Sequence, residues 1–238
     1  MKYVYGPVRS RRLGFSLGIS TVPYKVCSLD CVYCQLEKTT QKTMKRKEYV
    51  KKEEVLEEVK TFFDEKPSRP KIDYVTFSGS GEPTLHQSIG DLIRGVKTMT
   101  RVPVALLTNS TTLVDPKVRR DILDADVVIP SLDAVTQDIF EKIDRPLEGV
   151  RIEDIIEALS RFRQEFKGKI WLEVMLVRGL NDSPAYLRRI KKITDRLKAD
   201  RVQLNSPVRP PSEEWVKPVS REALSKAKKI FGDNCDVF

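Results

Sequence analysis

Cysteine, aromatic side chains and long apolar runs are all scarce in this chain. Three of its four cysteines lie within eight residues, whereas a secreted disulfide framework spreads its cysteines along the chain and pairs them. No apolar run approaches the ~20 residues that a membrane span needs. Segment 1–12 is polar and basic, without the apolar centre of a secretory signal. These absences predict a soluble, cytoplasmic protein with no membrane partner.

Positive charge, in contrast, is in excess. The formal net charge is +9. A basic surface attracts anions such as nucleic acid, phosphorylated metabolites and acidic proteins, although a well-solvated surface rich in ion pairs carries similar charge. Charged residues alternate with apolar runs, which argues against extensive disorder. With 238 residues, 40% of them apolar, we expect a single domain over residues 1–238 with its core at about 15–206.

The apolar pattern predicts six repeats of a strand followed by a helix. The strands are short runs rich in Val, Ile and Leu, as parallel strands buried on both faces should be: 15–19, 72–77, 102–107, 127–129, 170–176 and 202–204. Helices are predicted at 55–63, 89–99, 116–123, 152–162, 187–197 and 224–231. Six units predict an α/β fold, a partial (β/α)6 TIM-like barrel, because a full barrel needs about 250 residues. An open doubly wound sheet is the alternative.

Polar residues follow each predicted strand, at the edge where parallel α/β folds bind ligands. In strand order they are Cys27, Cys31 and Cys34; Gly79, Ser80, Gly81 and Glu82; Asn109; Ser131 and Asp133; Asn181 and Asp182; and Asn205. Each alone is compatible with an ordinary turn or helix cap. Because they converge on one face, they predict a binding site, with the irregular stretches 35–47 and 206–218 as loops beside it.

The cysteine spacing indicates a metal centre. Cys27, Cys31 and Cys34 place three thiolates on one short loop, and thiolates favour iron–sulfur clusters or zinc. Structural zinc usually has four ligands, so zinc would have to recruit the distant Cys235 or His86. A cubane held by three cysteines leaves one iron open to bind another molecule. The spacing therefore favours an iron–sulfur cluster and leaves zinc as the alternative.

These motifs resemble those of the radical S-adenosylmethionine (SAM) superfamily. The three cysteines have that family's spacing, Tyr33 is an aromatic residue before the third cysteine, and residues 79–82 are similar to its Gly-Gly-Glu element. Ser80 is the one departure within that element. The resemblance spans about 15–206 and implies a partial six-unit barrel. It also implies a [4Fe–4S] cluster on the cysteines with its fourth iron open for SAM.

The resemblance further implies a set of SAM contacts. The methionyl amino group would bind at Gly79, Gly81 and Glu82, the ribose at Ser131 and Asp133, and the adenine near Tyr33 and the backbone of Leu176 and Val177, with Asn109 as a further contact. A flavodoxin- or ferredoxin-like donor would supply one electron. SAM would then give methionine and a 5′-deoxyadenosyl radical, which abstracts hydrogen from the substrate. The enzyme would be of oxidoreductase or lyase type.

Three further segments narrow the resemblance. Residues 5–14, 77–86 and 205–211 are similar to iron–sulfur oxidoreductases related to the tRNA wyosine-synthesis enzyme. That enzyme carries a second cluster on additional upstream cysteines, whereas this sequence has none before Cys27. The resemblance therefore implies a single cluster and leaves the substrate open.

Several arginines are candidates for binding the substrate. Arg9, Arg11, Arg12 and Arg209 carry guanidinium groups suited to phosphate or carboxylate, so we expect an anionic substrate, either tRNA or a small metabolite. We expect His86 to cap a helix start and Cys235 to be a buried free thiol. Two other functions stay open. One is a zinc-stabilised RNA-binding module without catalysis, for which 8% aromatic residues are few. The other is a glycyl-radical activase acting on a partner protein.

Overall fold

The computed structural model of the chain describes residues 1–65 and 71–238. Its centre is an eight-stranded sheet with the order β1-β2-β5-β6-β7-β8-β9-β10. Six consecutive strands of this sheet are parallel: β2 (Gly14–Ile19), β5 (Tyr74–Phe77), β6 (Val104–Thr108), β7 (Val127–Pro130), β8 (Lys169–Met175) and β9 (Arg201–Asn205). These are the six strands predicted from the apolar runs, each displaced by no more than two residues at either end.

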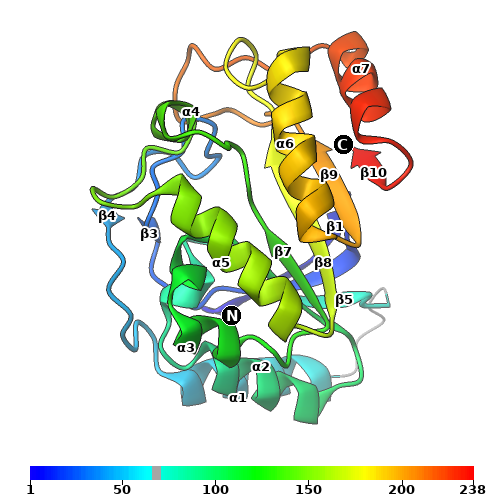
Figure 1. Ribbon diagram of the computed structural model, residues 1–238. Helices are drawn as coiled ribbons and strands as arrows, with labels where there is room; N and C mark the ends of the chain where they lie inside the picture. Colours follow the sequence, from blue (N-terminus) through cyan, green and yellow to red (C-terminus); the bar gives the residue numbers. More distant parts are fainter. Residues whose placement is uncertain (66–70) are drawn as a thin grey trace.

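The helices also follow the prediction. They are α1 (Lys52–Asp64), α2 (Ile89–Met99), α3 (Pro116–Asp121), α5 (Ile152–Glu165), α6 (Pro184–Leu197) and α7 (Arg221–Phe231). Two of them begin with proline at the first helical position after a capping side chain: Asp115 precedes α3 and Ser183 precedes α6. In Figure 1 they follow one another in chain order around the sheet, from α1 at the bottom to α7 at the upper right. No helix in the described residues is long and apolar enough to cross a membrane.

The two faces of the sheet differ, and this difference distinguishes a barrel from a doubly wound sheet. One face packs Leu17, Phe77 and Leu106 against apolar residues of α1, α2 and α5. The opposite face carries a separate apolar group of strand residues, which includes Ile129 and Trp171 and contains no helix residue. Because the helices cover one face only, the sheet is a partial barrel with an inner and an outer side.

The sequence reading missed several short elements. Two of them extend the sheet at its edges: β1 (Val4–Ser10) pairs antiparallel with β2, and β10 (Cys235–Val237) pairs parallel with β9. The others are β3 (Val26–Cys27), β4 (Gln41–Lys42), α4 (Gln137–Ile143) and the 3-10 helices η1 (Pro83–Leu85) and η2 (Thr111–Val114). Segment 1–12, expected to be a basic segment, is therefore largely an edge strand, and stretch 35–47 is interrupted by β4. Edge strands bury too few side chains to leave an apolar run in the sequence.

Candidate functional site

The three clustered cysteines lie on a loop whose backbone is held from several directions. Cys27 ends β3, and Cys31 and Cys34 follow in the loop; all three are free thiols of intermediate exposure. The bonds that hold the loop are Thr43 N to Cys27 O (2.9 Å), Asp30 N to Asp144 O (2.9 Å), Val32 N to Ile143 O (2.9 Å) and Ser212 Oγ to Cys31 O (2.9 Å). The last bond comes from stretch 206–218, which therefore packs on the cysteine loop as expected of a loop beside the site.

The sulfur atoms themselves make few contacts. Asn109 Nδ2 donates to Cys27 Sγ at 3.3 Å, and Lys25 Nζ donates to Cys34 Sγ at 3.2 Å. Burial, with a smaller contribution from the Glu82 carboxylate, raises the pKa of Cys27 to about 11. Burial and the neighbouring Asp144 carboxylate raise the pKa of Cys31 well above its ordinary value. Both effects favour the neutral thiol over the thiolate, because a buried negative charge next to carboxylates is unfavourable.

The donor set of this loop, three thiols without a fourth local ligand, suits an iron–sulfur cluster. Within residues 1–65 and 71–238, no three His, Cys, Asp or Glu side chains are close enough to share one metal ion. A zinc ion gathers its sulfur ligands at about 2.3 Å. The irons of a cubane sit at separate corners and accept thiolates that lie farther apart. Three half-buried thiols on one loop are a donor set of the kind that iron–sulfur clusters use.

The glycine-rich loop after β5 lies directly against the start of the cysteine loop. Lys25 N donates to Ser80 O at 2.6 Å, and Glu82 N donates to Val26 O at 3.1 Å. A Cβ atom on Gly81 would lie 2.0 Å from Val26 O, so only glycine permits this approach. Gly79 has a φ of 108°, which also favours glycine. The two motifs singled out in the sequence are thus in backbone contact.

Glu82 is a buried carboxylate surrounded by neutral donors. Its Oε1 accepts from Thr84 Oγ1 at 2.6 Å and from Thr108 Oγ1 at 2.8 Å, and its Oε2 accepts from Asn109 N at 2.7 Å. Burial raises the pKa of Glu82, and the hydrogen bonds oppose that shift. Because all three of these donors are uncharged, an ammonium group bound here would supply the missing positive charge.

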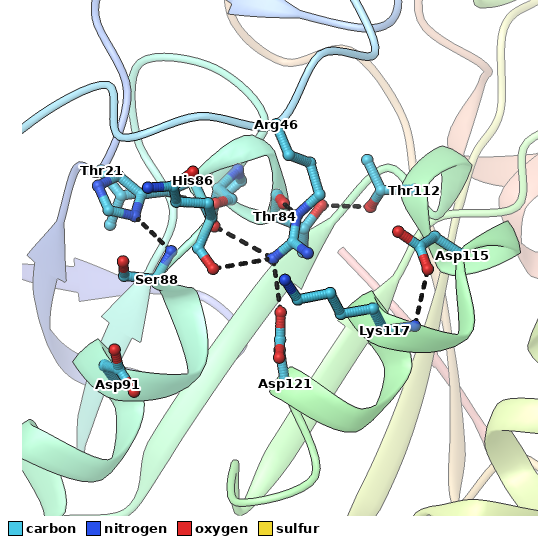
Figure 2. Close-up of polar contacts among 12 residues, drawn as sticks. Thr21, Arg46, Thr84, His86, Ser88, Asp91, Thr112, Asp115, Lys117 and Asp121 are labelled. Atoms are coloured by element: carbon cyan, nitrogen blue, oxygen red, sulfur yellow. Dashed lines mark hydrogen bonds and ion pairs between the residues drawn. The ribbon is translucent and has the colours of Figure 1, made fainter.

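Arg46 braces the turn that carries Glu82 and was not anticipated from the sequence. Figure 2 shows its guanidinium between this turn and α3, where it bonds to Asp121 Oδ2 at 2.7 Å. The same group donates to the backbone oxygens of Thr84 (3.0 Å) and His86 (3.3 Å). His86 is itself buried, and its Nδ1 accepts from Ser88 N at 3.1 Å just before α2. His86 is the residue that ends η1, and the N-cap of α2 is Ser88 without a side-chain cap bond, so the expected capping role of His86 is not confirmed.

One of the two predicted ribose-binding residues, Asp133, contacts Tyr33. The Tyr33 hydroxyl donates to Asp133 Oδ2, and Met175 N donates to Asp133 Oδ1 at 2.7 Å. Burial raises the pKa of Asp133 to about 7. A small cavity is lined by Asn109, Ser131, Asp133 and Asp144 together with apolar residues. Two of the predicted SAM contacts after β7 and one after β6 therefore share one cavity.

Asp144 lines the same cavity and was not among the residues predicted from the sequence. Its side chain is buried, and its Oδ1 has no hydrogen-bond partner among the described residues. Burial and the neighbouring Asp133 raise its pKa well above the ordinary value. Both oxygens of Asp133 are already bonded within the chain, so Asp144 offers the unused acceptor in this cavity. Its position at the end of the short helix α4 left no signal in the sequence.

Leu176 and Val177 are fully buried after β8, with their backbone N–H groups already used. Leu176 N donates to Asn205 O at 2.7 Å, and Val177 N donates to Asn181 Oδ1 at 2.8 Å. Asn181 also donates to the backbone oxygens of Asp133 and Met175. It therefore joins the ends of β7 and β8, which explains an asparagine after the fifth predicted strand. Contacts of these residues with adenine stay a prediction.

The four candidate arginines divide into two groups. Arg9 and Arg11 are exposed. Arg12 is committed to Glu173 through an ion pair, and Arg209 donates to Gln35 Oε1 at 2.6 Å, which links stretch 206–218 to the cysteine loop. Arg9 and Arg11 lie at the turn before β2, at the amino ends of the parallel strands, whereas the exposed Arg209 follows β9 on the side of the strand-end site.

Comparison with known proteins assigns the chain to a protein family. The profile of the "Radical SAM superfamily" matches residues 21–190. Over 236 residues the chain is 42% identical to a protein named "GTPase Obg" from Brachyspira hyodysenteriae, covering 99% of this chain and 34% of that one. It is 36% identical over 233 residues to a UPF0026 protein from Methanocaldococcus jannaschii, covering 98% of this chain and 72% of the relative. The chain therefore spans about a third of the first of these relatives and most of the second.

A solved structure supports the fold. The crystal structure of a radical SAM methyltransferase from Sphaerobacter thermophilus superposes with a TM-score of 0.71 at 17% identity. The superposition covers 94% of this chain and 65% of that protein. Similarity at this level of identity concerns the arrangement of the barrel.

Proposed function

We propose that Cys27, Cys31 and Cys34 ligate a [4Fe–4S] cluster and that SAM binds beside them at the carboxyl ends of the strands. The chain belongs to the radical SAM superfamily, whose members use this cluster and SAM. When bound and reduced, the cluster would supply the electron that cleaves SAM to methionine and a 5′-deoxyadenosyl radical, and this radical would abstract hydrogen from the substrate. The chain's own residues hold, orient and shield the reactants.

One observation carries this proposal: Asn109 touches both motifs. Its side chain donates to Cys27 Sγ at 3.3 Å, and its backbone N–H donates to Glu82 Oε2 at 2.7 Å. A cluster ligand and the carboxylate assigned to the SAM amino group are therefore separated by a single residue. This adjacency is what a site requires when SAM binds at the open iron of the cluster.

The SAM contacts follow from the same geometry. Glu82, surrounded by neutral donors, gains a charged partner in the methionyl ammonium group. The family resemblance assigns Gly79 and Gly81 to the same group. The ribose hydroxyls are assigned to Ser131 and Asp133, as the family resemblance implies, and Asp144 lies beside Asp133. Tyr33, Leu176 and Val177 then border the adenine.

The reaction requires an electron donor and a substrate. We assign a flavodoxin- or ferredoxin-like protein as donor. We assign a substrate with an anionic part, either tRNA or a small metabolite, because the net charge is +9 and Arg209, which follows β9 on the side of the strand ends, is exposed. Comparing modified tRNA nucleosides and small metabolites in cells with and without the gene tests the two substrate classes. If the modified nucleosides are the same in both cells, tRNA is excluded as the substrate.

The test of the proposed function is anaerobic purification with cluster reconstitution. The protein should be brown, contain iron and acid-labile sulfide, and release 5′-deoxyadenosine from SAM when dithionite is added. Cys31→Ala should lose the colour and the product. Cys235→Ala is the matched control, because that thiol is buried on β10 at the far edge of the sheet, and it should retain both.

A colourless protein with stoichiometric zinc would contradict the proposal and favour the zinc alternative. So would a Cys31→Ala protein that still forms 5′-deoxyadenosine. Iron and sulfide content distinguish these two outcomes, because the first lacks a cluster and the second retains one.

A further inference from the structure

The inner side of the barrel becomes polar near its carboxyl edge, where β8 and β9 run side by side. Val202 and Leu204 pack outward with residues of α6 and α7. Since side chains alternate along a strand, Gln203 and Asn205 face inward. Glu173 on β8 is in register with Gln203. These three side chains form an inner polar patch that no step of the proposed chemistry uses.

Two oxygen atoms of this patch lack a donor. Gln203 and Asn205 are 1% and 2% exposed, and in the part of the chain that the structure describes, Gln203 Oε1 and Asn205 Oδ1 have no hydrogen-bond partner. Buried polar groups are nearly always paired, because an unpaired one forfeits its bonds to water. Two unpaired acceptors on one strand, facing the same interior, point to a ligand that donates.

The charged members of the patch are already matched to each other. Glu173 Oε2 pairs with the Arg12 guanidinium, which reaches it from the turn between β1 and β2. Glu173 Oε1 accepts from Asn205 Nδ2 at 2.7 Å. Neither cationic nor anionic charge is in excess, so the unmet requirement is for hydrogen-bond donors. A phosphate or carboxylate offers acceptors only and would not satisfy it.

The inner polar patch adjoins the proposed SAM site. Glu173 O accepts from Leu132 N at 2.9 Å, between Ser131 and Asp133, and Asn205 O accepts from Leu176 N at 2.7 Å. A molecule bound to the patch therefore lies next to the residues assigned to the ribose and adenine. That is where a hydrogen atom must be presented to the radical.

We infer that Gln203 and Asn205, braced by Glu173 and Arg12, bind a hydrogen-bond-donating group of the substrate, such as an amide, an amidine or an amine. This inference rests on the proposed function for the reaction it serves. The substrate then carries a donor group inside the barrel in addition to the anionic part assigned above. An amide oxygen accepts an N–H bond from either a neutral or a cationic group, so the patch selects for donors rather than for charge.

Three small probes of the same shape test the inference. Acetamide, acetamidinium and acetate differ mainly in donors and charge, and saturation-transfer NMR detects the methyl signal of each in the presence of the reconstituted protein and SAM. We expect transfer to acetamide and acetamidinium and none to acetate. Gln203→Leu and Asn205→Leu should each reduce transfer at least about fivefold, as the loss of one or more hydrogen bonds implies. Gln164→Leu, the same kind of change on an exposed glutamine of α5, should leave it unchanged.

Measurements of the melting temperature and of SAM cleavage distinguish a failure of this inference from a failure of the proposed function. Gln203→Leu removes an unpaired buried oxygen, so its melting temperature should equal or exceed that of the wild type. A purely structural glutamine would give a lower one. Equal transfer to acetate, unaltered transfer in both leucine variants, or no transfer to any probe would overturn the inference. Absence of 5′-deoxyadenosine in the wild type, with probe binding intact, would overturn the proposed function alone.

Discussion

Replacing Gly81 by alanine tests the contact between the two motifs directly. The added Cβ would lie 2.0 Å from Val26 O, and real Cβ atoms essentially never come within 3.0 Å of another atom. The two segments must therefore separate by roughly 1 Å, the difference between these two distances. That movement breaks or weakens two backbone hydrogen bonds, Glu82 N to Val26 O and Lys25 N to Ser80 O.

The size of the effect follows from these losses. Overpacking costs about 1–3 kcal/mol, and each backbone hydrogen bond contributes about 0.5–1.5 kcal/mol. We therefore expect Gly81→Ala to lower the free energy of unfolding by roughly 2–6 kcal/mol, measured by urea unfolding followed by circular dichroism. Formation of 5′-deoxyadenosine should fall further than the loss of folded protein explains, because Cys27 and Glu82 move apart.

Gly149→Ala is the control, since Gly149 also has a glycine-specific role but no crowding. Its φ is 84° and a Cβ added there would meet no atom within 4 Å, so alanine incurs only the left-handed backbone cost of about 1–2 kcal/mol. If Gly81→Ala destabilises the protein no more than Gly149→Ala does, and SAM cleavage is retained, the backbone contact between the motifs does not have the role described.

Three further predictions concern residues outside the SAM contacts. Arg46→Met should lower the free energy of unfolding by about 3–5 kcal/mol in urea, because it leaves Asp121 without its partner in a mostly buried ion pair; a loss below about 1 kcal/mol, the range of an exposed pair, would contradict the bracing role. Burial lowers the pKa of His86, so the unfolded chain takes up a proton near pH 6.5 that the folded chain refuses, and stability should fall as the pH drops from about 7.5 to about 5.5; His86→Gln should have a shallower pH dependence, and an identical one would refute this. Burial raises the pKa of Cys235 to about 11, so iodoacetamide at about pH 7.5 should label it, by peptide mass mapping, far more slowly in native than in urea-unfolded protein; equal rates would mean that the thiol is accessible.

The sequence was most informative about the strands whose two faces are both buried. Parallel strands covered on both sides require continuous apolar runs, so β5 and β8 could be located from Val, Ile and Leu alone. The strand-end rule then placed Cys27, Glu82 and Asn109 on one edge, and the structure brings these three into hydrogen-bonding contact. Their roles toward SAM came from the family resemblance, and the relation to the wyosine branch stays a prediction.

The parts that were missed depend on partners far away in the sequence. In the sequence, Arg46 is one of several basic residues in a loop. Only the fold shows that its guanidinium bonds to Asp121 and to the backbone oxygen of His86. Arg12 was predicted to bind an anionic substrate, whereas in the structure its guanidinium forms an ion pair with Glu173, 161 residues away in the sequence. No local pattern distinguishes a charge that meets an internal partner from one that stays in water, because both occupy the same polar position in the alternation of a strand or turn.

The cysteine loop is shaped by its backbone more than by its sulfur atoms. Its main chain is bound by Thr43, Asp144 and Ser212, which come from three separate segments. The sulfurs accept only two hydrogen bonds from side chains of the described residues, and sulfur is a weak acceptor. Removing one thiol therefore leaves the bonds that define the loop in place. A Cys31→Ala protein that folds but stays colourless would report the loss of a cluster ligand, since the scaffold that presents the other two thiols does not depend on it.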